Sequence, residues 1–143
     1  MECEFPISNA SDEEVDSILE TYKNVAIVGL STNPEKDSYR VGKFLQYHGY
    51  KIIPVHPKAE EILEEKVYPT LRDIPGQVDV VCLFRPPDQV PPFVDAAIEI
   101  GAKVVWMQLG IVNNEAADKA REAGLKVVMN KCMKIEVARF VSK

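Results

Sequence analysis

Apolar residues along the chain follow two patterns that alternate from start to end. Continuous apolar runs, rich in β-branched residues, occupy 25–29, 51–55, 79–84, 103–108 and 125–129. Runs without polar alternation are typical of strands covered on both faces, as in a parallel sheet. Apolar residues at helical spacing follow most of these runs. They predict a helix that ends at Gly49 and further helices over 88–100, 113–123 and 132–141.

Two segments depart from this alternation, one before the first strand and one between the second and third strands. Ser11 and Glu14 have the spacing of a capping box, and Val15, Ile18 and Leu19 follow at helical spacing, so a helix precedes the first strand. We therefore expect residues 1–23 to form an N-terminal extension with a helix, and residues 24–143 to form a single domain. The stretch 56–77 is mostly loop, because prolines and a glycine interrupt it. Only 60–66 (EEILEEK) suggests a helical turn.

Strands that alternate with helices indicate an α/β fold with right-handed crossovers. We expect one doubly wound, parallel, five-stranded sheet, with the strands in the order 3-2-1-4-5. In such a sheet ligands bind beyond the carboxyl ends of the strands, where the strand order reverses. This order predicts a crevice between the first and fourth strands.

Composition narrows the function. The chain has 143 residues and a net charge of −5, which argues against a nucleic-acid partner. Its three cysteines and two histidines have no ligand-like spacing, so we expect no metal site. No apolar run approaches the 18 residues of a membrane span, and the acidic start does not resemble a signal peptide. We expect a cytoplasmic protein that does not bind membranes.

The loop after the first strand has the chemistry of an anion site. Gly29 allows the backbone to approach a ligand, and the helix that follows offers free N–H groups and the positive end of its dipole. Hydroxyl and guanidinium groups that suit phosphate follow in Ser31, Thr32, Tyr39 and Arg40. The alternative is a loop that only connects the strand to the helix, with solvated polar residues.

Other nucleotide sites fit the sequence less well. The glycine spacing of a dinucleotide fingerprint is absent, and the second strand ends in VHPK, where an NAD site has an acidic residue. His56 or Lys58 would suit a phosphorylated ribose, which leaves NADP open. No Walker lysine and no G-x-S-x-G motif is present.

Several motifs together resemble the small stand-alone CoA-binding proteins. They are VAIVGLS at 25–31, YPTL at 68–71, VDVV at 78–81, GAKVVWMQLGI at 101–111 and AREAGLKVVMNKCMKIE at 120–136. Those proteins are Rossmann-like domains similar to the amino-terminal domain of the succinyl-CoA synthetase α subunit. The likeness covers residues 24–139.

The resemblance implies bound coenzyme A or an acyl-CoA. By comparison with the synthetase domain, the turn at 29–32 would cradle the phosphates, Lys58 would meet the adenosine end and its 3′-phosphate, and the segment at 107–110 would lie along the pantetheine arm. The complete expected binding set is Gly29, Leu30, Ser31, Thr32, Tyr39, Arg40, His56, Pro57, Lys58, Phe84, Arg85, Pro86, Met107, Gln108, Leu109 and Gly110. We expect Gly29→Val to abolish binding while leaving the fold largely intact.

The resemblance implies binding of coenzyme A but no ligase activity. The family often reads D-R-C-x-x-x-E-H near its end, whereas this chain has Asn130 and Val137 in place of the Asp and the His. We expect the protein to have no catalytic residues and no chemistry of its own. Alternatives are an NADP-dependent oxidoreductase, a CoA-ligase subunit that needs a partner chain, and a CoA-responsive regulatory module whose first helix could form a homodimer face. Cys132 is a candidate for a mixed disulfide with the CoA thiol.

Overall fold

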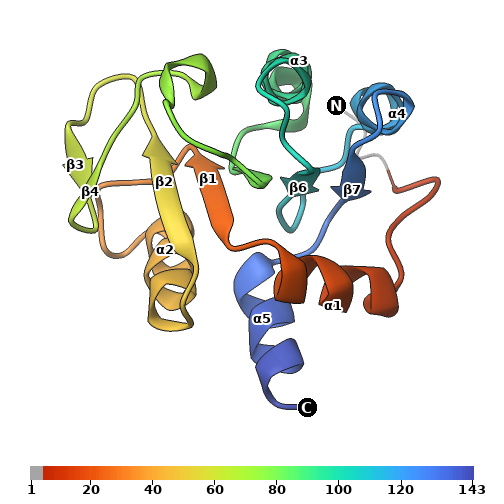
Figure 1. The fold of residues 1–143 in the computed structure, drawn as a ribbon, viewed down its shortest axis with the longest axis horizontal. Helices are drawn as coiled ribbons and strands as arrows, with labels where there is room; N and C mark the ends of the chain where they lie inside the picture. The colour runs from red at the N-terminus through yellow and green to blue at the C-terminus, as the bar shows by residue number, and fades with distance from the viewer. Residues whose placement is uncertain (1–4) are drawn as a thin grey trace.

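The computed structural model describes residues 5–143 as an α/β structure around one parallel sheet. The five strands stand in the order β2-β1-β5-β6-β7, and every neighbouring pair is parallel (Figure 1). Their bounds are β1 Asn24–Val28, β2 Lys51–Val55, β5 Val80–Leu83, β6 Val104–Met107 and β7 Lys126–Val128. The α/β class and the parallel five-stranded sheet are confirmed.

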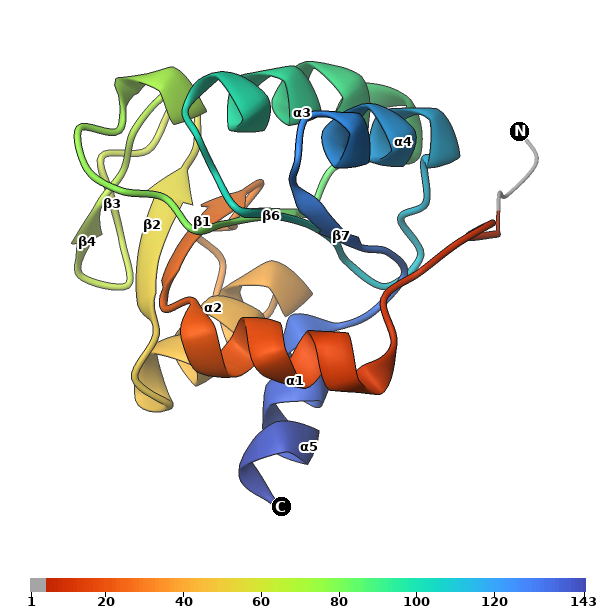
Figure 2. The same ribbon diagram turned by 45° about the vertical axis from the view of Figure 1, so that its right-hand side comes forward.

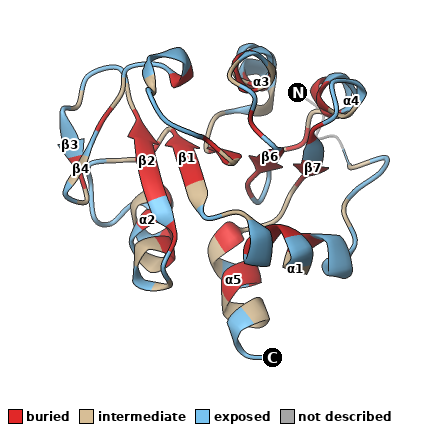
Figure 3. Ribbon diagram, in the orientation of Figure 1, coloured by how far each residue is buried: buried red, intermediate tan, exposed pale blue. Residues whose placement is uncertain are grey.

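Helices cover both faces of the sheet. The helices α3 (Val90–Glu99) and α4 (Asn114–Glu122) lie on one face, and α1 (Asp12–Thr21), α2 (Asp37–Tyr47) and α5 (Met133–Val141) lie on the other (Figure 2). Two short 3₁₀ helices, η1 (Leu71–Asp73) and η2 (Pro87–Gln89), stand in the connections before and after β5. A separate apolar cluster fills the space on each side of the sheet, which leaves the central strands buried (Figure 3).

The predicted N-terminal helix is present and belongs to one of these clusters. Ser11 and Glu14 form the expected capping box of α1. Val15, Ile18 and Leu19 are buried in the cluster that also contains residues of α2 and α5. An ion pair of 2.8 Å between Asp16 and Arg139 joins α1 to α5.

The predicted strand order was wrong. It placed the third main strand beyond the second, whereas β5 pairs with β1, and β2 lies at one edge of the sheet. Pro54 explains the edge position of β2, because proline has no N–H to donate and is confined to edge strands. All residues of β5 are buried, as a central strand requires. The strand order therefore reverses between β1 and β5, and not between the first and fourth strands.

The segment 60–66 is also not helical. It forms a hairpin of β3 (Glu61–Ile62) and β4 (Glu65–Lys66), which turns through Leu63 and Glu64 at φ values of 55° and 66°. Two consecutive positive φ values define a tight hairpin turn of a type that usually needs Gly, Asn or Asp. The turn is held on α2, where Gln46 donates a hydrogen bond of 2.9 Å to the Leu63 carbonyl. A tertiary contact thus overrides the local sequence preference.

Candidate functional site

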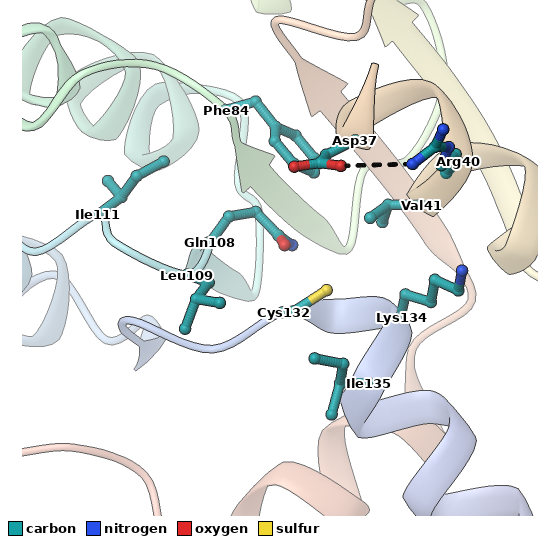
Figure 4. Close-up of a pocket in the computed structure, with 10 residues that line it drawn as sticks. All are labelled: Asp37, Arg40, Val41, Phe84, Gln108, Leu109, Ile111, Cys132, Lys134 and Ile135. Atoms are coloured by element: carbon teal, nitrogen blue, oxygen red, sulfur yellow. Dashed lines mark ion pairs between the residues drawn. The ribbon is translucent and has the colours of Figure 1, made fainter. Parts of the chain in front are cut away.

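Two cavities open at the carboxyl ends of the strands. The first, which we call the basic cavity, has a volume of about 560 Å³ and is lined by Val28, Gly29, Leu30, Ser31, Val55, His56, Pro57, Lys58, Pro69, Arg85 and Phe93. The second, the apolar cavity, has about 450 Å³ and is lined by Asp37, Arg40, Val41, Phe84, Gln108, Leu109, Ile111, Cys132, Lys134 and Ile135 (Figure 4). The consecutive residues Phe84 and Arg85 line one cavity each, so the two adjoin at the end of β5.

Gly29 is required by the backbone between β1 and α2. Its φ is +85°, and a Cβ added there would lie 2.6 Å from the carbonyl oxygen of Phe84. The loop after β1 and the loop after β5 therefore touch at this glycine, between the two cavities. This contact contradicts our expectation that Gly29→Val leaves the fold largely intact, because the added side chain meets the backbone of the neighbouring loop.

The loop after Gly29 folds back onto the first turn of α2. The backbone N–H of Ser31 donates to the hydroxyl of Ser38 at 2.9 Å, and Ser38 is buried. Lys36 occupies the N-cap of α2 without a side-chain hydrogen bond to the helix. The first-turn N–H groups, which have no acceptor within a helix, are thus left uncapped by that side chain. Such a helix end is suited to an anion.

Charge in the basic cavity has one sign. Lys58 and Arg85 line it together with His56, and no carboxylate does. The terminal guanidinium nitrogen of Arg85 donates to the Gln89 carboxamide. The Nε atom of Arg85 is buried and has no hydrogen-bond partner. Because a buried donor without a partner is costly, this atom is suited to an acceptor supplied by a ligand, such as a phosphate oxygen.

The floor of the apolar cavity is organised by Gln108. Its carboxamide is almost fully buried; the nitrogen donates to Cys82 Sγ at 2.9 Å and the oxygen accepts the backbone N–H of Met133 at 3.3 Å. Cys132 is the N-cap residue of α5 but makes no side-chain cap bond. Gln108, directly after β6, therefore accepts a first-turn N–H of α5. Burial raises the pKa of the Cys82 thiol to about 12, so this thiol is unreactive.

The walls of the apolar cavity combine apolar side chains with a few charges at its edge. Leu109 and Ile135 are 66% and 58% exposed and stand beside Cys132 in Figure 4. The guanidinium of Arg40 lies 4.0 Å from the Asp37 carboxylate across the first turn of α2. Lys134 also reaches this cavity. The cavity is suited to a flexible, mainly apolar arm.

The predicted residues divide between the cavities. The basic cavity takes Gly29, Leu30, Ser31, His56, Pro57, Lys58 and Arg85, and the apolar cavity takes Arg40, Phe84, Gln108 and Leu109. Arg40 thus lies apart from the phosphate cradle to which the sequence assigned it. Neither cavity is lined by Thr32, Tyr39, Pro86, Met107 or Gly110. Met107, for example, is fully buried in the core.

Some lining residues had escaped the sequence analysis. Lys134 and Ile135 stand in the first turn of α5, the helix that follows the last strand. The rule that ligands bind beyond the strand ends could have identified both. Pro69 and Phe93 reach the basic cavity from a loop and from α3, and no sequence pattern indicates their positions.

Residues 5–143 contain neither a metal-binding cluster nor a membrane-spanning helix. No group of three or more His, Cys, Asp and Glu side chains is arranged to hold a metal ion in this part of the chain. The helices described there are also too short or too polar to cross a bilayer.

The comparisons of this chain with known proteins agree on one family. The sequence model of the family described as "CoA binding domain" matches residues 23–138. "Uncharacterized protein YneT" of Bacillus subtilis is 40% identical over 137 residues, which cover 96% of this chain and 100% of that protein. The solved structure of a "hypothetical protein from Pyrococcus horikoshii OT3" has 47% sequence identity and a TM-score of 0.90, with 99% of each chain covered.

Part of a ligase subunit is also similar in sequence to this chain. "Acetate--CoA ligase [ADP-forming] II subunit alpha" of Pyrococcus furiosus is 32% identical over 111 residues, which cover 76% of this chain but 24% of the subunit. This chain therefore corresponds to about a quarter of that subunit's length.

Proposed function

Since the chain belongs to the CoA-binding domain family, we propose that it binds coenzyme A or an acyl-CoA across the two adjoining cavities, without chemistry of its own. The observation that carries the proposal is the pair of cavities that meet at Phe84 and Arg85. One is basic and the other is largely apolar. Coenzyme A has the matching division into a phosphorylated nucleotide and a long arm that ends in a thiol.

The basic cavity would receive the nucleotide. Lys58 and Arg85 supply positive charge, and Gly29 lets the backbone approach the phosphates without a Cβ in the way. The unpartnered Nε of Arg85 would gain an acceptor in a phosphate oxygen. A net charge of −5 does not oppose this, because the ligand meets the local charge of the cavity.

The apolar cavity would receive the pantetheine arm and its sulfur end. Phe84, Leu109 and Ile135 offer apolar contacts to the methylene groups of the arm. Cys132 stands in the same cavity, so the sulfur of the ligand and the thiol of the protein would share one space. Binding, and not ligase chemistry, is proposed because the chain spans 24% of the ligase subunit it resembles.

A thermal-shift panel tests the function. The purified protein is heated alone and with CoA, acetyl-CoA, NAD, NADP or ATP, each well above its expected dissociation constant. A ligand at about 100 times that constant adds about 2.7 kcal/mol to the free energy of unfolding. For a domain of this size, this raises the melting midpoint by several degrees. A rise with the CoA species alone supports the proposal, and a rise with NADP alone contradicts it.

A further inference from the structure

The imidazole ring of His56 closes the turn that leaves β2. Its Nδ1 atom accepts the backbone N–H of Lys58 at 3.0 Å and that of Ala59 at 3.1 Å. A ring nitrogen that accepts N–H groups carries no proton, so the proton of the neutral ring is on Nε2. The backbone of the turn thereby fixes the tautomer of His56.

The main chain on both sides of His56 is equally restrained. Its N–H donates to the Tyr68 carbonyl at 3.0 Å, and Val55 and Tyr68 form an isolated parallel bridge. Pro57 fixes its own φ and keeps the residue before it extended. The ring is therefore set in place by β2 on one side and by the turn on the other.

We propose that the Nε2–H of His56 donates a hydrogen bond to the same ligand phosphate that the Lys58 ammonium binds; this inference rests on the proposed function. His56 and Lys58 line the same cavity, in which no carboxylate competes for their donors. Both hydrogen bonds of the ring use Nδ1. Within residues 5–143, Nε2 makes no hydrogen bond. The ring thus offers one free donor beside a cation.

The two side chains supply different parts of phosphate recognition. The Lys58 ammonium is a flexible point charge that attracts any anion. The ring Nε2–H of His56 is fixed in direction, because rotating the ring would break both hydrogen bonds at Nδ1. His56 therefore adds directional selection to the charge of Lys58.

The tautomer is measured first, in the protein without ligand. The ¹⁵N shifts of the ring nitrogens, read through their couplings to the ring protons at neutral pH, distinguish a protonated nitrogen from an unprotonated one. We expect a proton on Nε2 and none on Nδ1. A proton on Nδ1 overturns the inference before any ligand is added.

The contact is then measured with two ligands that differ by one phosphate. His56→Asn places its amide oxygen near the position of Nδ1 and can still accept the turn N–H groups, but it has no donor at the Nε2 position. We expect this variant to bind CoA about tenfold more weakly than the wild type, as for a lost hydrogen bond to a charged group. Its affinity for 3′-dephospho-CoA should stay within about twofold of the wild-type value, since that ligand lacks the phosphate assigned to Lys58.

Two comparisons complete the experiment. His48→Asn replaces the other histidine, at the C-cap of α2, and should leave both affinities unchanged. If His56→Asn loses affinity equally for both ligands, or for neither, this inference is overturned but the proposed function is not. A wild-type protein that binds neither ligand overturns the proposed function as well.

Discussion

The carbonyl oxygen of Phe84 lies 2.6 Å from the position that a Cβ on Gly29 would occupy. The end of β5 thus packs directly against the loop that follows β1, at the point where the strand order reverses. A side chain at Gly29 has to displace backbone atoms. The same glycine serves the fold and the proposed ligand cradle.

Gly29→Ala is expected to destabilise the protein. The positive φ of +85° costs a non-glycine residue about 1–2 kcal/mol. The contact with the Phe84 carbonyl adds to that cost. Gly76→Ala is the matched control, because a Cβ there meets nothing within 4 Å. Chemical denaturation of both variants measures the difference, and equal stability of Gly29→Ala and the wild type would remove the close contact from the account.

Arg85 should contribute to binding at the expense of stability. Arg85→Met removes the buried Nε that has no partner, so the free protein should be as stable as the wild type or more stable. Its affinity for CoA should fall about tenfold or more, as a hydrogen bond to a charged phosphate is worth about 1.5–3 kcal/mol. Calorimetric titration and thermal unfolding measure the two effects. Arg72→Ala, which removes an exposed partner of Glu99, is the control and should keep wild-type affinity.

The cysteines should differ sharply in reactivity. In a Cys3→Ser background, an alkylating reagent at neutral pH should modify Cys132, which is partly exposed, and spare Cys82, whose pKa is raised to about 12 by burial.

Incubation of the same protein with CoA disulfide tests whether Cys132 forms a mixed disulfide with CoA. The Cys132 thiolate would attack one sulfur, form a protein–CoA disulfide and release the other CoA as a thiolate. Intact mass should show one CoA added, reversed by reductant; an unchanged mass contradicts the adduct.

The Asp16 carboxylate should make stability depend on pH in the acid range. Hydrogen bonds from Lys143 and Arg139 lower the pKa of Asp16 below its ordinary 3.8. The group therefore stabilises the fold at pH values above 3.8, and this contribution is lost as the pH falls through the lowered pKa. Unfolding of the wild type and Asp16→Asn across pH 2–6 should show a gap that closes in acid. A gap that is constant with pH would mean that the carboxylate charge does not matter.

The strands and helices could be predicted because their signals are local. Continuous apolar runs such as those of β1 and β5 indicate buried parallel strands wherever they stand in the sheet. Strand order depends on which strands pair, and the apolar pattern of each run is nearly the same. Pro54 carried the missing information, because a proline excludes a central position for β2.

The candidate site was predicted less completely for a similar reason. The turns at Gly29 and Lys58 lie next to strand ends and were identified from the sequence. The hydrogen bond from Met133 to Gln108, and the opening of the cavity to Phe93, join residues distant in the chain. Such contacts are decided by packing, so no spacing along the sequence indicates them.

The central claim is that one ligand spans both cavities, and competition between the halves of CoA tests it most directly. Adenosine 3′,5′-bisphosphate and pantetheine are each titrated into the protein by calorimetry, alone, together and against CoA. We expect CoA to bind at one site per chain, each fragment to weaken CoA binding, and the two fragments to bind at the same time. Fragments that exclude one another, or a pantetheine that leaves CoA affinity unchanged, would contradict the assignment of the nucleotide to one cavity and the arm to the other.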